Sequence, residues 1–239
     1  MENMNLNKHI SGQFNEELEN LRNHVMKMGG MVEQQLTNAL NAVENTDEDL
    51  AQEVLTSDFK INLLEVSIDE ECTKIIAKRQ PAASDLRLIL AIAKAVTDLE
   101  RIGDEAGRIA KVALKSFSGA QQEFLISLDN MGRQVLKMLH DTLDAFARMD
   151  VDAAFDIHKE DQKVDREYEA LTRQLMTYMM EDPRSIPKIM DVLWSARSLE
   201  RIGDRCQNIC EYVIYFVKGK DVRHITREQI QKDILGSGQ

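Results

Sequence analysis

The sequence has 239 residues, of which 43 % are hydrophobic and 30 % are charged, and its formal net charge at pH 7 is −11. This composition is typical of a soluble globular protein of one or two domains. The negative charge would repel a phosphate backbone, and an aromatic content of 5 % offers few rings on which bases could stack. We therefore expect no nucleic-acid partner.

Membrane insertion and secretion are not expected either. The best apolar stretch, Leu86 to Val96, is interrupted by Lys94 and falls short of the roughly 18 residues that span a bilayer. The N-terminus lacks the basic and apolar regions of a signal peptide. Three cysteines do not make a disulfide framework, and Cys206 and Cys210 stand one helical turn apart on an apolar stripe. The sequence therefore predicts a cytoplasmic protein with reduced, buried cysteines.

Turn-forming residues are rare, with only 11 Gly and 3 Pro in the whole chain. Few turns imply long elements, and apolar residues that recur three and four positions apart indicate helices. We therefore predict an all-α protein. Its six long helices are expected at approximately 10–44, 49–78, 84–117, 121–148, 151–181 and 187–218.

An internal repeat divides the chain into two similar halves. The segment LERIGD at 99–104 returns at 199–204, a spacing of 100 residues, and upstream matches such as Val32 with Val135 and Asp58 with Asp161 have a spacing of 103. Short connections make consecutive helices antiparallel. The repeat therefore predicts two tandem antiparallel three-helix bundles, over residues 1–118 and 119–219, with a C-terminal tail over residues 220–239 that forms a short helix or is disordered.

The last predicted helix shows the clearest pattern of a bundle core. Its apolar and small residues alternate spacings of three and four, which is the pattern of a helix packed in a bundle. These residues are Ile189, Val192, Ala196, Leu199, Gly203, Cys206, Cys210, Val213 and Val217. The expected N-terminal caps are Thr46 or Asp47 and the corresponding Asp150 for the two middle helices and Ser84 for the third helix, and Gly219 suits a C-terminal stop.

The repeated segment places two carboxylates one turn apart in each half. Glu100 and Asp104, and again Glu200 and Asp204, stand at positions i and i+4 and so project from the same helix face. Adjacent carboxylates repel each other, and a hard cation that takes oxygen ligands would relieve the repulsion. These four residues are the primary candidate metal ligands. Acids of the second helices are secondary candidates: Asp58, Asp161 and Asp165.

Neighbouring residues of the repeated segment support this interpretation without deciding it. Gly103 and Gly203 suggest a close helix approach or a ligand near the backbone, because glycine inside a helix costs about 1 kcal/mol relative to alanine. Arg101 and Arg201 allow the alternative that the acids form only salt bridges. From the residues alone, a metal site and an interhelical salt-bridge surface both remain open.

Other chemistries lack their signatures. The sequence contains no HExxH, GxxxxGK[ST], GxGxxG or CxxC motif, and no Glu-x-x-His pair of the ferritin type. The five histidines, at 9, 24, 140, 158 and 224, are scattered and are expected at the surface, as is Glu211. We therefore predict no catalytic residues and no enzyme, while a carboxylate-bridged metalloenzyme and a plain helical scaffold stand as alternatives to a metal-binding adaptor.

The duplicated LERIGD segment, the segment RQPAASDLRLI at 79–89 that opens the third helix, and the six-helix repeat together resemble the PhoU family. The likeness covers about residues 8 to 218. It implies two tandem three-helix bundles whose E/DxxxD motifs can hold metal clusters, and it carries the metal-ligand role to Glu100, Asp104, Glu200 and Asp204. The resemblance implies divalent or trivalent metal ions and leaves their identity open among iron, zinc, manganese and magnesium.

The same resemblance implies a role in phosphate homeostasis. A PhoU-like protein would be a negative regulator of the phosphate regulon that links the ATPase subunit of a phosphate ABC transporter to a PhoR-type sensor histidine kinase. It would self-associate as a homodimer. Its expected location is the cytoplasm, peripheral to the inner membrane through these partners.

Overall fold

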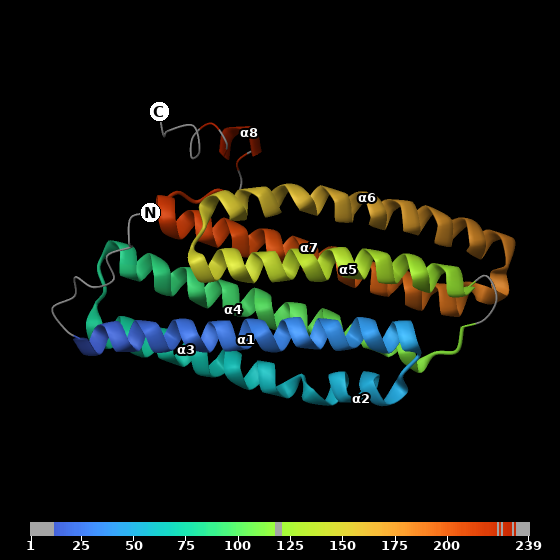
Figure 1. Cartoon of the computed structure of the whole chain (residues 1–239), viewed down its shortest axis with the longest axis horizontal. Coiled ribbons are helices and arrows are strands. Elements are labelled where there is room, and N and C mark those ends of the chain that lie inside the picture. The colour runs from blue at the N-terminus through green and yellow to red at the C-terminus, as the bar shows by residue number, and fades with distance from the viewer. Residues whose placement is uncertain (1–11, 118–120, 224, 226, 231, 233–239) are drawn as a thin grey trace.

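The computed structural model describes all residues except 1–11, 118–120, 224, 226, 231 and 233–239. No strand occurs in this part of the chain, which confirms the all-α class. Long helices lie side by side along the long axis of the molecule (Figure 1). Their bounds are α1 Gly12–Asn45, α2 Glu48–Ser57, α3 Phe59–Arg79, α4 Ala83–Ala110, α5 Gln121–Arg148, α6 Val151–Glu181 and α7 Ile186–Lys218.

The second predicted helix is divided at Asp58 into α2 and α3. At this point the N–H of Ile61 donates to the carbonyl of Asp58, three residues back, at 2.9 Å, so the helix tightens for one turn. The matching residue of the second repeat, Asp161, lies inside the unbroken α6. The prediction of six long helices is therefore confirmed, with the second helix interrupted at the single residue Asp58 in the first repeat and continuous in the second.

Most helix ends agree with the sequence signals. Asp47 accepts a hydrogen bond from the N–H of Leu50, Asp150 accepts one from Ala153, and Gly219 ends α7 in the left-handed conformation with φ of 70°. Two details differ. The N-terminal cap of α4 is Ala82 instead of Ser84, and α4 ends at Ala110, where the 3-10 helix η2 continues over Lys111–Leu114.

The two repeats share one hydrophobic core. Helix α4 packs against α1 and α3 of its own repeat and against α7, while α7 packs against α5, α6 and α4. In Figure 1 the helices of the second repeat, α6, α7 and α5, occupy the upper part of the view, and α4, α1, α3 and α2 of the first repeat lie below them. Buried apolar residues of both repeats form a single continuous cluster. The repeats are thus two structural copies joined through a common interior.

A pair of glycines fixes the approach of α1 to α5 across the two repeats. A Cβ atom on Gly29 would collide with the side chain of Leu143, and a Cβ atom on Gly132 would collide with the side chain of Leu40. With the spacing of 103 residues, Gly29 corresponds to Gly132 and Leu40 to Leu143. The contact is therefore reciprocal, as expected for two copies related by a pseudo-two-fold axis.

The predicted core of the last helix is largely confirmed. Its pattern residues are buried from Ile189 to Val213, and Cys206 and Cys210 are fully buried with free thiols. Burial raises the pKa of the Cys210 thiol to about 12, so this cysteine is inert at neutral pH. Val217 is the exception because it lies 38 % exposed in the last turn of the helix.

In the C-terminal region the structure contains the short helix α8, Arg227–Ile230. Val222 and Ile230 are buried against the bundle, so this part of the tail packs on the core. Within the described residues, none of the helices combines the length and apolar character needed to cross a membrane.

Candidate metal centres

The glycine of each repeated segment creates the space in which the acidic residues meet. A Cβ atom on Gly203 would lie 2.8 Å from Oδ1 of Asp161, and one on Gly103 would lie 3.5 Å from Oδ1 of Asp58. The second-helix aspartate of each repeat therefore rests directly over the backbone of the LERIGD helix. This observation explains the mid-helix glycines as a requirement for close approach.

We define the first acidic site as Asp58, Glu65, Glu100 and Asp104, and the second acidic site as Asp161, Asp165, Glu200 and Asp204. Helices α3 and α4 position the first site together with the α2–α3 junction, and helices α6 and α7 position the second. The structure thus brings all the sequence-predicted ligands of each repeat into one neighbourhood. It does not bring the two sites together, because each belongs to its own repeat.

The two sites differ in the hydrogen bonding of their carboxylates. In the first, Nε2 of Gln35 donates to Oδ1 of Asp58 at 3.0 Å and to the carbonyl of Gly103 at 3.3 Å. In the second, position 138, which corresponds to Gln35, is Met138 and offers no donor. Oδ1 of Asp161 and Oε2 of Glu200 are buried atoms without a hydrogen-bond partner. The second site therefore contains unsatisfied carboxylate oxygens.

The electrostatics of both sites favour a bound cation or proton. Burial, followed by the charges of Asp165 and Asp204, raises the pKa of Asp161 to about 7. Burial and neighbouring carboxylates also raise the pKa of Glu100, Asp104, Glu200 and Asp204. The carboxylates of both LERIGD segments are thus destabilised in their ionised form, and a bound positive ion would relieve this destabilisation.

The donor set fits a hard metal ion, although the side chains are not arranged around one. Among the described residues, no three His, Cys, Asp or Glu side chains are placed closely enough to hold a single ion. Carboxylate oxygens are the preferred ligands of magnesium, calcium and manganese. In the second site, the buried oxygens Oδ1 of Asp161 and Oε2 of Glu200 have no hydrogen-bond partner. The residues present therefore match a metal in chemistry.

The arginines of the repeated segments pair with acids outside the two sites. Arg201 binds Glu105 at 3.3 Å, Arg101 lies 3.8 Å from Asp98, and Arg205 binds Asp98 at 3.4 Å. Asp98 and Glu105 lie on α4 and are buried between α4 and α7. Arg201 thus joins α7 to α4 across the two repeats, whereas Arg101 pairs within α4, and neither arginine forms an ion pair with the carboxylates of the LERIGD segments. Of these carboxylates, Glu200 pairs with a different arginine, Arg197, at 2.6 Å.

Several residues of the sites were missed by the sequence reasoning. Glu65 belongs to the first site, where its charge contributes to the raised pKa of Glu100, and its spacing of seven residues from Asp58 was an available signal. Gln35 carried no motif and could not be found from sequence. His158 and Glu211, expected at the surface, are both buried, and Nε2 of His158 lies 3.6 Å from Glu211.

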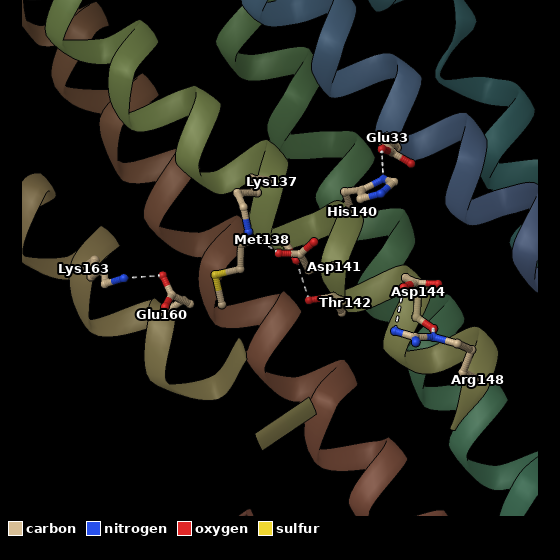
Figure 2. A network of polar contacts seen from close by, with 10 residues as sticks. All are labelled: Glu33, Lys137, Met138, His140, Asp141, Thr142, Asp144, Arg148, Glu160 and Lys163. Atoms are coloured by element: carbon tan, nitrogen blue, oxygen red, sulfur yellow. Dashed lines mark hydrogen bonds and ion pairs between the residues drawn. The ribbon is translucent and has the colours of Figure 1, made fainter. Parts of the chain in front are cut away.

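The groove between α5 and α6 is a second place where charged residues gather (Figure 2). It is a cavity of about 580 Å³ beside Met138. Within it Lys137 pairs with Asp141 at 2.6 Å and Lys163 with Glu160 at 2.7 Å, as the dashed lines of Figure 2 mark. The lining contains three cations and three acids, since Arg166 and Glu167 add one of each, so this groove has no surplus charge with which to hold a ligand.

The chain matches the sequence model of the PhoU domain twice, over residues 25–113 and 128–213. It is 60 % identical over 237 residues to the phosphate-specific transport system accessory protein PhoU of Serratia marcescens, covering 99 % of this chain and 98 % of that one. The protein of the same name from Escherichia coli K12 is 58 % identical over 236 residues, with the same coverage.

Solved structures agree with these relatives. The crystal structure of PhoU from Pseudomonas aeruginosa superposes with a TM-score of 0.81 at 50 % identity, covering 87 % of this chain and all of that one. The phosphate transport system regulatory protein PhoU of Streptococcus pneumoniae gives a TM-score of 0.80 at 33 % identity, covering 87 % of this chain and 99 % of the other. The two matched segments and the near full-length identity lead to one conclusion: the chain belongs to the PhoU family.

Proposed function

We propose that this protein is an accessory regulator of phosphate transport that acts as a metal-binding adaptor. It couples the ATPase subunit of a phosphate ABC transporter to a PhoR-type sensor histidine kinase and keeps the phosphate regulon repressed when phosphate is plentiful. The relatives are named accessory and regulatory proteins of phosphate transport, and none of these names describes an enzyme. This supports a regulatory role without catalysis.

The observation that carries the metal-binding part is the unsatisfied second acidic site. Buried oxygens of Asp161 and Glu200 lack partners, and the pKa of Asp161 is raised to about 7. A buried carboxylate without a partner is costly unless a proton or cation neutralises it. A divalent or trivalent ion would supply that charge, and Glu200, Asp204, Asp161 and Asp165 would hold it.

The metal in this proposal has a structural role. It would join α7 to α6 in the second repeat and α4 to α3 in the first, since each site takes ligands from both helices. Removing it would leave carboxylates repelling each other across each helix pair. An adaptor stabilised in this way presents a fixed surface to its partners, at the cytoplasmic face of the membrane and as a homodimer.

The deciding experiment compares bound metal in the wild type and in a variant with Glu100, Asp104, Glu200 and Asp204 all changed to alanine. Elemental mass spectrometry of untagged protein, after incubation with iron, zinc, manganese or magnesium, should find stoichiometric metal in the wild type and none in a folded variant. A matched control changes four exposed acids outside the sites and should retain the metal: Glu48, Glu70, Asp156 and Glu160.

The same experiment separates the two sites. Changing only Glu100 and Asp104 to alanine should remove about half of the metal, because the sites lie in different repeats. Equal metal content in the wild type and the quadruple variant would overturn the metal assignment. The regulatory role has its own test: deletion of the gene should derepress a phosphate-responsive reporter in cells grown with ample phosphate.

A further inference from the structure

A second cavity combines positive charge with an exposed tryptophan. It has a volume of about 480 Å³ and lies between the C-terminal end of α4 with η2 and the first half of α7. We call it the basic pocket. Its charged lining residues are four cations, Arg108, Lys111, Arg197 and Arg201, and one acid, Asp191. In a chain with a net charge of −11, such a local excess of cations is unexpected.

Trp194 gives the basic pocket an apolar wall. The side chain of this residue, which is the one tryptophan of the sequence, is 60 % exposed although it is large and aromatic. Tryptophan and arginine are the residue types most enriched among energetically dominant contacts of protein interfaces. Their juxtaposition at one concave site points to a binding surface.

The arginines keep donors for a ligand despite their ion pairs. Arg108 binds Glu105 at 2.6 Å, Arg201 binds Glu105 at 3.3 Å, and Arg197 binds Glu200 at 2.6 Å, in each case through Nη1. A guanidinium group has five N–H donors, so each arginine retains others. With Glu105 and Glu200 counted beside Asp191, the four cations still exceed the acids by one.

The equivalent surface of the other repeat lacks this character. At a spacing of 100 residues, Lys111 corresponds to Glu211, Arg108 to Asn208 and Trp194 to Lys94. There, Nζ of Lys94 lies over the rings of Tyr212 and Tyr215, at 5.6 and 5.3 Å from their centroids. The basic pocket is therefore a feature of one face only, and the pseudo-symmetry of the fold does not require it.

From these observations we propose that the basic pocket docks an acidic segment of a partner protein, with carboxylates on the arginines and Lys111 and an apolar side chain on Trp194. A free phosphate ion fits less well. An inorganic ion would leave Trp194, the apolar wall of the pocket, uncovered. An acidic segment with one aromatic or aliphatic residue satisfies both walls.

This proposal rests on the proposed function as an adaptor, and it names the surface and the chemistry of the partner. Its position also connects it to the second acidic site, because Arg197 reaches Glu200 from the pocket. The side chain of Arg197 thus lines the basic pocket and also contacts the second acidic site.

Trp194 allows a direct test on the full-length protein, because tryptophan fluorescence reports on this pocket alone. The probe is a blocked pentapeptide with four glutamates around a central phenylalanine, titrated at low ionic strength. We expect a saturable change in emission. The double variant Lys111→Gln with Arg108→Gln should weaken binding roughly tenfold or more. A control with the same loss of charge, Lys94→Gln with Lys74→Gln, should bind as the wild type does.

Calorimetry should show that Trp194→Ala binds the same peptide more weakly than the wild type does, although this substitution removes no charge. Equal affinity of both double variants for the peptide would overturn the proposal. So would displacement of the peptide by inorganic phosphate at matched ionic strength, which would mark a small-anion site. Failure of the regulatory role appears separately, as an unchanged phosphate response in a strain that lacks the gene while peptide binding by the purified protein persists.

Discussion

The two acidic sites contain equivalent carboxylates on the LERIGD segments but differ in how their buried oxygens are satisfied. Asp58 receives a hydrogen bond from Gln35, whereas Asp161, the equivalent aspartate, has an unpartnered oxygen, and the position that corresponds to Gln35 is Met138. Asp161 is also more deeply buried than Asp58. Repetition of a motif therefore does not guarantee repetition of its electrostatics. The second site depends more strongly on an external charge.

The largest difference is expected from neutralising this aspartate in each site. In metal-free protein at pH 8, Asp161→Asn should raise the free energy of unfolding by about 2 kcal/mol, because it removes a buried charge whose pKa is about 7. Asp58→Asn should change it by less than about 1 kcal/mol, since the Gln35 hydrogen bond already stabilises that carboxylate. Urea unfolding in chelator measures both, and equal changes would remove the distinction between the sites.

The same asymmetry predicts a pH dependence. The folded pKa of Asp161 lies above its unfolded value of 3.8, so the carboxyl binds a proton more tightly in the folded state. Its contribution to stability is complete below pH 4 and is lost as the pH rises toward 7. Metal-free wild type should therefore lose stability over this range relative to Asp161→Asn. Parallel stability curves for the two proteins would contradict the assignment.

Exchanging the residue types at positions 35 and 138 should make the hydrogen bonding of each site resemble that of the other. Gln35→Met removes a donor to Asp58 and to the carbonyl of Gly103, and should cost about 1–2 kcal/mol of stability without metal. Met138→Gln places a donor at the equivalent position of the second site and should lower the pKa of Asp161, because a hydrogen bond to the carboxylate favours its ionised form. Carboxyl titration by NMR follows the latter change. An unaltered titration would show that Met138 is not the reason for the difference.

The smallest effect distinguishes the two glycines. A Cβ atom at position 203 lies 2.8 Å from the Asp161 carboxylate, so Gly203→Ala should displace that side chain and destabilise the protein by about 1 kcal/mol. At position 103 the nearest atom is Cδ1 of Ile61 at 3.3 Å, and the gain of about 1 kcal/mol in helix propensity should offset the tighter contact. Thermal unfolding should therefore show a lower melting temperature for Gly203→Ala and little change for Gly103→Ala.

Much of the fold was predictable because it depends on local patterns. The apolar spacing of α7, the capping aspartates Asp47 and Asp150, and the duplicated LERIGD segment each record a local requirement of the chain. The division of the second helix at Asp58 was not predictable, because the identical residue in the second repeat lies in an unbroken helix. Surroundings in three dimensions decide that difference.

The candidate sites were predictable in their acids and unpredictable in their surroundings. A spacing of i and i+4 locates Glu100 and Asp104 on one face, but nothing in the spacing shows that Gln35 reaches across from α1. The basic pocket is a stronger example. Its cations come from α4, η2 and α7, and they form a positive cluster in a chain whose net charge is negative. Only the packing of α4 on α7 gathers them.

The reciprocal glycine and leucine contacts between α1 and α5 have an evolutionary consequence. Two copies that meet through identical surfaces have the geometry of an isologous homodimer, in which every substitution acts twice. Once a gene duplication has joined the copies in one chain, each position changes alone. One half is then free to acquire a tryptophan and arginines while the other keeps a lysine over tyrosines. Covalent linkage thus converts a symmetric ancestor into a molecule with two different faces.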